Sequence, residues 1–220
     1  MYSHKLELWY REAYQEHGMN PAEIDRAYAI FPKRMYSFMT EPKSIDFTFI
    51  GGLHTDPATF HNRQWILPFI QSHFGEPSYL QFTDAVTKMD YIPMGHFDKT
   101  LQKKGFVPKE VPISDRNFFD EHYYSILRKS RFCLCPAGDQ LWSMRFYEAI
   151  MSRCIPIVDS VEETYRTQEE SELDYKFYLT SSNFIYREDW AEHNYQLFMT
   201  YHTLDRKFSA QTENPLVEHE

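Results

Sequence analysis

The residues best suited by type and spacing to do chemistry lie between Ser130 and Asp159. A strand-like run ends at Pro136, and Gly138 follows in a turn where the missing side chain lets the backbone approach a ligand. A helix is expected to begin near Ser143, and the free N–H groups and positive dipole at its amino terminus suit a diphosphate. Ser143 either caps this helix or binds a phosphate oxygen.

Two charged side chains on the same expected helix favour nucleotide binding. Arg145 stands near the helix start, where a guanidinium can bind two phosphate oxygens at once. Glu148 follows one turn later and can accept hydrogen bonds from two ribose hydroxyls. The alternative is a surface ion pair between Arg145 and Glu148, which contributes only about 0.2–0.5 kcal/mol. The spacing alone leaves both interpretations open.

A second group of candidates follows the strand expected at Ile45–Ile50. Gly51 and Gly52 end this strand in a turn that is expected to lie at the ligand-binding edge of the sheet. His54 and Asp56 come next, as a catalytic base or as ligands of sugar hydroxyls. Ordinary loop polarity explains both residues equally well.

Arg63 follows this loop, near the start of the next expected helix. It either joins Arg145 at the diphosphate or simply faces solvent. The segment Glu162–Glu172 is expected to be a solvated acidic loop without chemistry.

The elements that must position these residues alternate between strands and helices. Strands are expected at Ile45–Ile50, Ser78–Phe82, Arg131–Cys135, Ile155–Val158 and Tyr175–Thr180. Helices are expected at Thr59–His73 with a kink at Pro68, Asn117–Lys129, Ser143–Ser152 and Trp190–His202. This alternation predicts an α/β fold, a Rossmann-like parallel sheet with helices on both faces. The polar segment Asp84–Pro112 is a long connection suited to substrate contacts.

The first 44 residues are expected to form a helical arm packed on the main domain. Leu6–Glu16 has the periodicity of an amphipathic helix, and a second helix is expected from the capping pattern at Asn20-Pro21 to just before Pro32. The Rossmann-like domain then spans residues 45–205, and residues 206–220 form a C-terminal tail.

Composition narrows the class of protein. The net charge of −9 over 220 residues, without clustered Lys and Arg, argues against a nucleic-acid partner. No apolar run reaches the roughly 20 residues that span a bilayer, and the amino terminus lacks a signal peptide, so a cytoplasmic location is expected. The odd number of cysteines favours a reducing compartment. Cys133 and Cys135 lack a second ligand pair, so no metal and no cofactor is predicted.

The central run resembles the carboxyl-terminal donor-binding region of exostosin-like glycosyltransferases. Their pattern reads S-x-F-C-L-x-P-x-G-D, then S-x-R-x-x-E-A-I, then G-C-I-P-V. The positions that match are Ser130, Phe132, Cys133, Leu134, Pro136, Gly138, Asp139, Ser143, Arg145, Glu148, Ala149, Ile150, Cys154, Ile155 and Pro156. Arg153 departs from the pattern, because it replaces the glycine and is expected to alter the helix end.

This resemblance implies a GT-B-type fold of two Rossmann domains, of which this chain would be the donor-binding one. It implies transfer of a sugar, commonly from a UDP-sugar and with inversion, to a glycan or other hydroxyl acceptor. Arg145 would then contact the diphosphate, Glu148 the ribose, and the Gly138-Asp139 turn the sugar or phosphates. Charge on the leaving diphosphate would be stabilised by arginines and the helix dipole in place of a metal.

The chain is too short for a second Rossmann domain as well, so the acceptor side is expected from a homodimer or a separate acceptor-domain subunit. A non-catalytic nucleotide-sugar or glycan-binding module, or a donor-domain subunit of a larger transferase, is the alternative.

Overall fold

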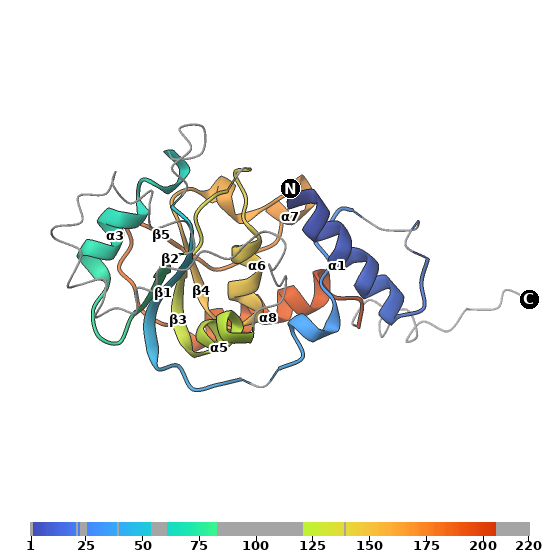
Figure 1. The fold of residues 1–220 in the computed structure, drawn as a ribbon, viewed down its shortest axis with the longest axis horizontal. Coiled ribbons are helices and arrows are strands. Elements are labelled where there is room, and N and C mark those ends of the chain that lie inside the picture. The colour runs from blue at the N-terminus through green and yellow to red at the C-terminus, as the bar shows by residue number, and fades with distance from the viewer. Residues whose placement is uncertain are drawn as a thin grey trace, which may run out of the picture.

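A five-stranded sheet lies at the centre of the computed structural model, which describes residues 2–20, 22, 26–38, 40–53, 61–82, 121–138 and 140–205 (Figure 1). The strands are β1 (Ile45–Gly51), β2 (Tyr79–Phe82), β3 (Ser130–Leu134), β4 (Ile155–Val158) and β5 (Tyr178–Leu179). Their order is β2-β1-β3-β4-β5, and every neighbouring pair is parallel. The predicted α/β class and parallel sheet are therefore confirmed.

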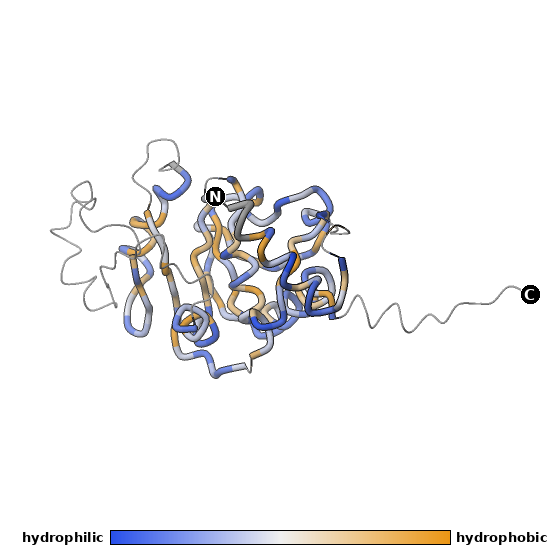
Figure 2. Tube along the Cα trace, turned by 45° about the vertical axis from the view of Figure 1, so that its right-hand side comes forward, coloured by the Kyte–Doolittle hydropathy of each residue, from blue (hydrophilic) through white to orange (hydrophobic). Residues whose placement is uncertain are grey.

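Helices cover both faces of this sheet, as predicted. On one face lie the 3-10 helix η3 (His61–Arg63) and α3 (Ile66–His73). On the other lie α5 (Glu121–Lys129) and α6 (Met144–Met151), with α1 (Tyr2–Glu16) and α8 (Glu188–Tyr201) packed against them. Strand alternation explains the division, because Phe132 and Leu134 of β3 pack with α3 while Cys133 between them packs with α6. Figure 2 shows apolar stretches following these strands.

The helix that connects β1 to β2 was expected to kink at Pro68, and the structure places this proline differently. The helix α3 begins at Ile66, so Pro68 lies in its first turn, where the missing N–H would have had no partner within the helix. Pro68 therefore removes no hydrogen bond within α3, so it gives no reason for the predicted kink. The segment Asp84–Pro112 lies outside the described residues, as does the C-terminal tail at 206–220.

The N-terminal arm contains one of its two predicted helices. The helix α1 is confirmed and buries Trp9, Tyr10 and Ala13 in the core shared with α6 and α8. The second helix is wrong for residues 26–32, which are irregular, although Asn20 Oδ1 does accept the predicted capping bond from Ala22 N at 3.0 Å. The backbone of this segment finds distant partners instead: Ala29 N donates to Glu170, and Phe31 N donates to the carbonyl of His202.

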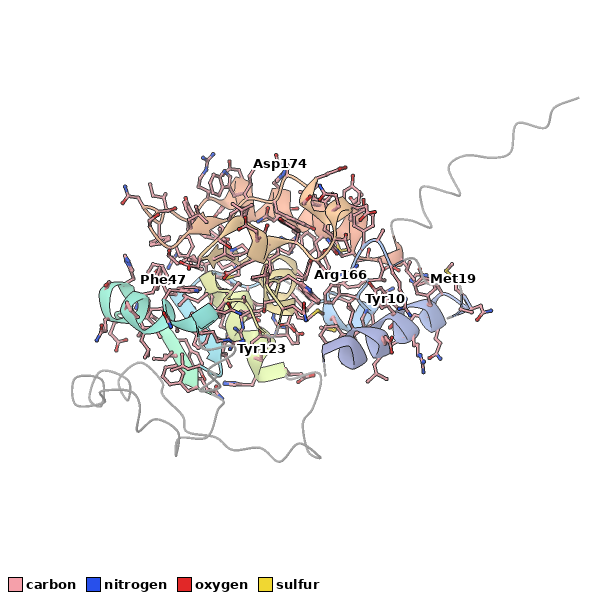
Figure 3. The ribbon with its side chains drawn as sticks, turned by 90° about the horizontal axis from the view of Figure 1, so that it is seen from above. Tyr10, Met19, Phe47, Tyr123, Arg166 and Asp174 are labelled. Atoms are coloured by element: carbon pink, nitrogen blue, oxygen red, sulfur yellow. The ribbon has the colours of Figure 1, made fainter. Side chains whose placement is uncertain are left out.

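The acidic segment after β4 is folded, and its prediction as a solvated loop is wrong. It forms the 3-10 helix η7 (Val161–Thr164) and the short helix α7 (Gln168–Ser171), and both Glu163 and Glu170 are buried. The carboxylate of Glu170 accepts hydrogen bonds from Ala29 N, Arg166 N and the hydroxyl of Tyr147. Arg166 and Tyr10 of α1 both donate to carbonyls of residues 26–28, where this segment meets the arm (Figure 3 labels both side chains).

Candidate functional site

The candidate site lies at the carboxyl edge of the sheet, where β1 and β3 are neighbours. The chain moves from β1 outward to β2 and then returns to place β3 on the other side of β1. Sheets of this kind bind ligands outside the strand ends at such a reversal of strand order. Gly51 ends β1 here, and the segment 135–138 leaves β3 beside it.

Ser143 occupies the N-cap of α6. Its backbone is extended, and its hydroxyl oxygen accepts a hydrogen bond from the N–H of Arg145 at 3.3 Å. Of the two roles considered for Ser143, the structure shows the cap. Every residue of α6 is buried except Arg145, so this helix presents a single charged side chain at its amino end.

The guanidinium of Arg145 lies against the end of β1. A side chain at Gly51 would place its Cβ 3.1 Å from Arg145 Cζ and 3.3 Å from Nη1, so it would have to displace the guanidinium. The guanidinium also faces the Phe49 ring, with Cζ 5.2 Å from the ring centroid. Its Nε and Nη1 are shielded from solvent and have no hydrogen-bond partner among the described residues. Buried N–H donors of a cation are costly unless an acceptor meets them, so this position suits an anion.

Arg145 remains charged in this environment. Burial alone would lower its pKa, but nearby Tyr123, Cys133, Cys135 and Glu148 outweigh that effect and raise the pKa above the usual arginine value.

Glu148 is fixed by two tyrosines of α5 rather than by Arg145. Its Oε2 accepts a hydrogen bond from the Tyr123 hydroxyl at 2.7 Å, and its Oε1 accepts one from the Tyr124 hydroxyl at 3.1 Å. Burial and the Glu148 charge raise the pKa of Tyr123, which therefore stays neutral and donates (Figure 3 labels this residue). Glu148 is buried, and the ion pairs of the described residues do not include one with Arg145. The surface-pair interpretation is therefore wrong.

Arg63 points inward and ties two strand ends together. Its Nε donates to the carbonyl of Ala137 at 3.0 Å, and its Nη1 donates to the carbonyl of Gly52. Its neighbour Asn62 donates from Nδ2 to the carbonyl of Gly138 at 3.1 Å. Arg63 is only 4% exposed, so the solvent-facing alternative is wrong. Its contact with a diphosphate stays a prediction.

Glu163 belongs to the same edge and was missed by sequence reasoning. Its Oε2 accepts a hydrogen bond from Asp159 N at 3.1 Å. Burial, together with the Asp159 charge, raises its pKa to about 7, although the N–H groups of Asp159 and Ala137 and the Arg63 charge oppose the shift. The available signal was its place five residues after the buried strand β4, but the surrounding run of glutamates resembled a solvated loop.

Three predicted site residues lie outside the described residues, namely His54, Asp56 and Asp139. Their roles as catalytic base, sugar ligand or phosphate ligand stay predictions. Within the described part of the chain, no group of three or more His, Cys, Asp or Glu side chains is arranged to hold a metal ion. The same part contains no helix long and apolar enough to cross a bilayer.

Arg153 ends α6 in the backbone conformation that the matching glycine would adopt. Its φ is +54°, and the hydrogen bond from Cys154 N to Ala149 O at 2.9 Å closes the helix. The side chain compensates by binding α8, with Nε 2.8 Å from Glu192 Oε2 and the guanidinium 3.5 Å from the centroid of the Tyr195 ring. The expected alteration of the helix end is therefore wrong.

Comparison with known proteins identifies the family. The family model of the exostosin GT47 domain matches residues 55–194, which is more than half of the chain. "Probable glycosyltransferase At5g25310" of Arabidopsis thaliana is 50% identical over 40 residues, which cover 18% of this chain and 8% of that protein. "Exostosin-1" of Drosophila melanogaster is 36% identical over 63 residues, which cover 28% of this chain and 8% of that protein. "Probable beta-1,4-xylosyltransferase IRX10L" of Arabidopsis thaliana is 40% identical over 52 residues, covering 21% and 12%.

The matched segments thus span about a tenth of these relatives. Among solved structures, "Crystal structure of GtfA/B complex" superimposes with a TM-score of 0.47 and 14% identity, covering 79% of this chain and 36% of that one. The family match covers β2 to β5 together with Arg63, Arg145 and Glu148. This chain belongs to the exostosin GT47 family of glycosyltransferases.

Proposed function

We propose that this chain binds a nucleotide-sugar donor, a UDP-sugar, and forms the donor-binding part of a GT-B-type enzyme that transfers the sugar to a hydroxyl of a glycan acceptor. The observation that carries this proposal is Arg145. Its charged guanidinium lies at the reversal of strand order, and two of its nitrogens have no partner among the described residues. A diphosphate offers the anionic, multidentate acceptor that such a group lacks.

Arg145 and the amino end of α6 would act on the leaving group. As the bond from sugar to diphosphate breaks, negative charge grows on the phosphate oxygens. A guanidinium and a helix dipole that are already in place stabilise this charge without reorganising at the moment of reaction. We therefore propose a metal-independent reaction with inversion at the anomeric carbon. His54 and Asp56 are the proposed bases.

Glu148 would recognise the ribose. Tyr123 and Tyr124 orient its carboxylate, and a carboxylate can accept hydrogen bonds from several donors at once. Ribose hydroxyls supply such donors, and Glu148 lies about one helical turn from Arg145.

The acceptor side requires more than the described residues. Because the matched relatives are far longer than the matched segments, we propose that a further domain, a second copy of this chain or a separate subunit supplies the acceptor wall. A binding module without transfer activity is the competing function.

The experiment measures binding of UDP, UDP-xylose and UDP-glucuronate by calorimetry, followed by slow hydrolysis of the bound donor. The variant Arg145→Ala should lose about thirtyfold or more in affinity, because truncating a charge-assisted pair costs about 2–5 kcal/mol. Arg131→Ala is the matched control, since Arg131 lies in the same β3–α6 unit but pairs with Asp46 at the opposite end of the strand. Unchanged affinity in Arg145→Ala would contradict the proposal, and binding without hydrolysis would favour the binding module.

A further inference from the structure

Two buried side chains face the same residue of the short segment that follows β3. The carbonyl of Ala137 accepts a hydrogen bond from Arg63 Nε at 3.0 Å. The N–H of the same residue faces the carboxyl group of Glu163 and lowers its pKa. A buried cation thus binds the carbonyl of Ala137, and the N–H of this buried residue faces a buried carboxyl group.

Each of these side chains also reaches a second strand end. Arg63 donates to the carbonyl of Gly52, directly after β1, and Glu163 accepts from the N–H of Asp159, directly after β4. The two residues therefore connect the carboxyl ends of three neighbouring strands through Ala137. We call Arg63, Glu163 and Ala137 the Ala137 brace.

The place of the brace indicates what it is for. Burying ionisable groups is expensive, and both Arg63 and Glu163 are at most 5% exposed. Arg63 comes from η3 and Glu163 from η7, two elements that lie far apart in the sequence. All three strand ends that they connect border the edge where Arg145 lies.

Among the described residues, two charged groups act on Glu163, and they come from separate elements. Asp159 at the end of β4 repels its ionised form, and Arg63 of η3 attracts it. The N–H groups of Asp159 and Ala137 can donate to an oxygen of the side chain whether or not the side chain is charged. A glutamine at this position therefore keeps the acceptor and removes the charge.

We propose that Arg63 and Glu163 are positioning residues that hold the backbone of residues 135–138 in the shape required for donor binding. The inference rests on the proposed function for its purpose, but the brace itself is a property of the chain without ligand. Neither residue touches the donor in this proposal. Both act through the backbone of Ala137 and Gly138, the latter also held by Asn62.

The test compares Glu163→Gln, Glu163→Ala and Arg63→Lys, and uses Glu170→Ala as the matched control. Glu170 is an equally buried carboxylate of the same acidic segment, but its partners are Ala29, Tyr147 and Arg166, away from the strand ends. Two measurements are made on each protein: amide hydrogen exchange without ligand, and the affinity for UDP-xylose.

Glu163→Ala and Arg63→Lys should speed exchange in residues 135–138 and lower the affinity for UDP-xylose about tenfold or more. Glu163→Gln should leave the exchange rate of residues 135–138 and the affinity for UDP-xylose within about threefold of the wild type. A purely electrostatic role of Glu163 would not allow this result. Glu170→Ala should lower the unfolding temperature while leaving the affinity of the folded protein unchanged.

Exchange in residues 135–138 that does not respond to Glu163→Ala would overturn the brace. Faster exchange together with unchanged affinity would overturn its role in donor binding. If the wild-type protein binds no nucleotide-sugar, the proposed function fails, and the exchange measurement alone still decides whether the brace exists.

Discussion

At the scale of single residues, Gly51 matters because the guanidinium of Arg145 lies against it. The position is part of β1, and any side chain there would displace the guanidinium of Arg145. Gly51→Ala should therefore lower the affinity for UDP-sugars about tenfold, while strand formation and stability change by less than about 1 kcal/mol. Calorimetric binding and urea unfolding of the variant check this expectation. Full affinity would show that Arg145 does not need its present position.

Glu163 gives the folded protein a defined pH dependence. Its pKa is raised from 4.5 to about 7 on folding, so the folded state prefers the protonated form. This stabilisation is complete below about pH 4.5 and is lost as the pH rises through about 7, with a size on the order of 3 kcal/mol. Urea unfolding across this range should show that the wild type loses stability relative to Glu163→Gln as the pH rises. A constant difference would contradict the shifted pKa.

Glu148→Gln tests the carboxylate at the ribose position. The amide replaces one acceptor oxygen by a donor, so one tyrosine hydroxyl loses its partner and stability should fall by about 1–3 kcal/mol. If the carboxylate also binds ribose, the affinity for UDP should fall more than the affinity for 2′-deoxy-UDP. An equal loss for both nucleotides would give Glu148 a purely structural role.

At the scale of elements, the end of α6 depends on one residue whose side-chain contacts offset the cost of its own backbone conformation. Arg153 adopts φ +54°, which costs a non-glycine residue about 1–2 kcal/mol, and its side chain gains contacts with Glu192 and Tyr195 of α8. Arg153→Ala keeps the backbone cost and loses the contacts, so it should destabilise by about 1 kcal/mol or more. Arg153→Gly loses both and should be closer to wild type. Thermal unfolding of the two variants distinguishes them, and a less stable glycine variant would refute the backbone argument.

The elements were predictable from sequence where local periodicity and core burial agree. The parallel strands β1 to β4 and the helices α6 and α8 lie within a few residues of their expected positions. The second helix of the arm fails because Ala29 and Phe31 hydrogen-bond to Glu170 and to the His202 carbonyl, partners that no local pattern reveals. The same reason hides Glu163, whose burial depends on strand ends brought together by the sheet.

The candidate site was predictable in its residues but less so in its contacts. Arg145 and Glu148 follow from helical spacing and from the family resemblance. That Glu148 would be held by Tyr123 and Tyr124, and Arg63 by two carbonyls, depends on how α5 and η3 pack on the sheet. Such packing is not encoded in the spacing of any single segment.

At the scale of the whole molecule, the arm is part of the core. Trp9, Tyr10 and Phe31 are at most 3% exposed and pack with α6 and α8. Deleting residues 1–40 should therefore remove thermal stability and nucleotide binding together, since fully burying one large apolar side chain alone contributes about 1.5–3 kcal/mol. Circular dichroism melting and calorimetry measure the two effects. A stable truncated protein that still binds UDP would instead place the arm outside the cooperative core.

The contact between Ala29 and Glu170 also has a consequence for synthesis of the protein. Its two partners are 141 positions apart, and Phe31 waits for His202 in the same way. A ribosome makes the arm before the sheet, but the hydrogen-bond partners of the arm emerge only after the sheet has been translated. The arm therefore reaches its native position only after the sheet has been made, and until then the apolar side chains of α1 are accessible to chaperones.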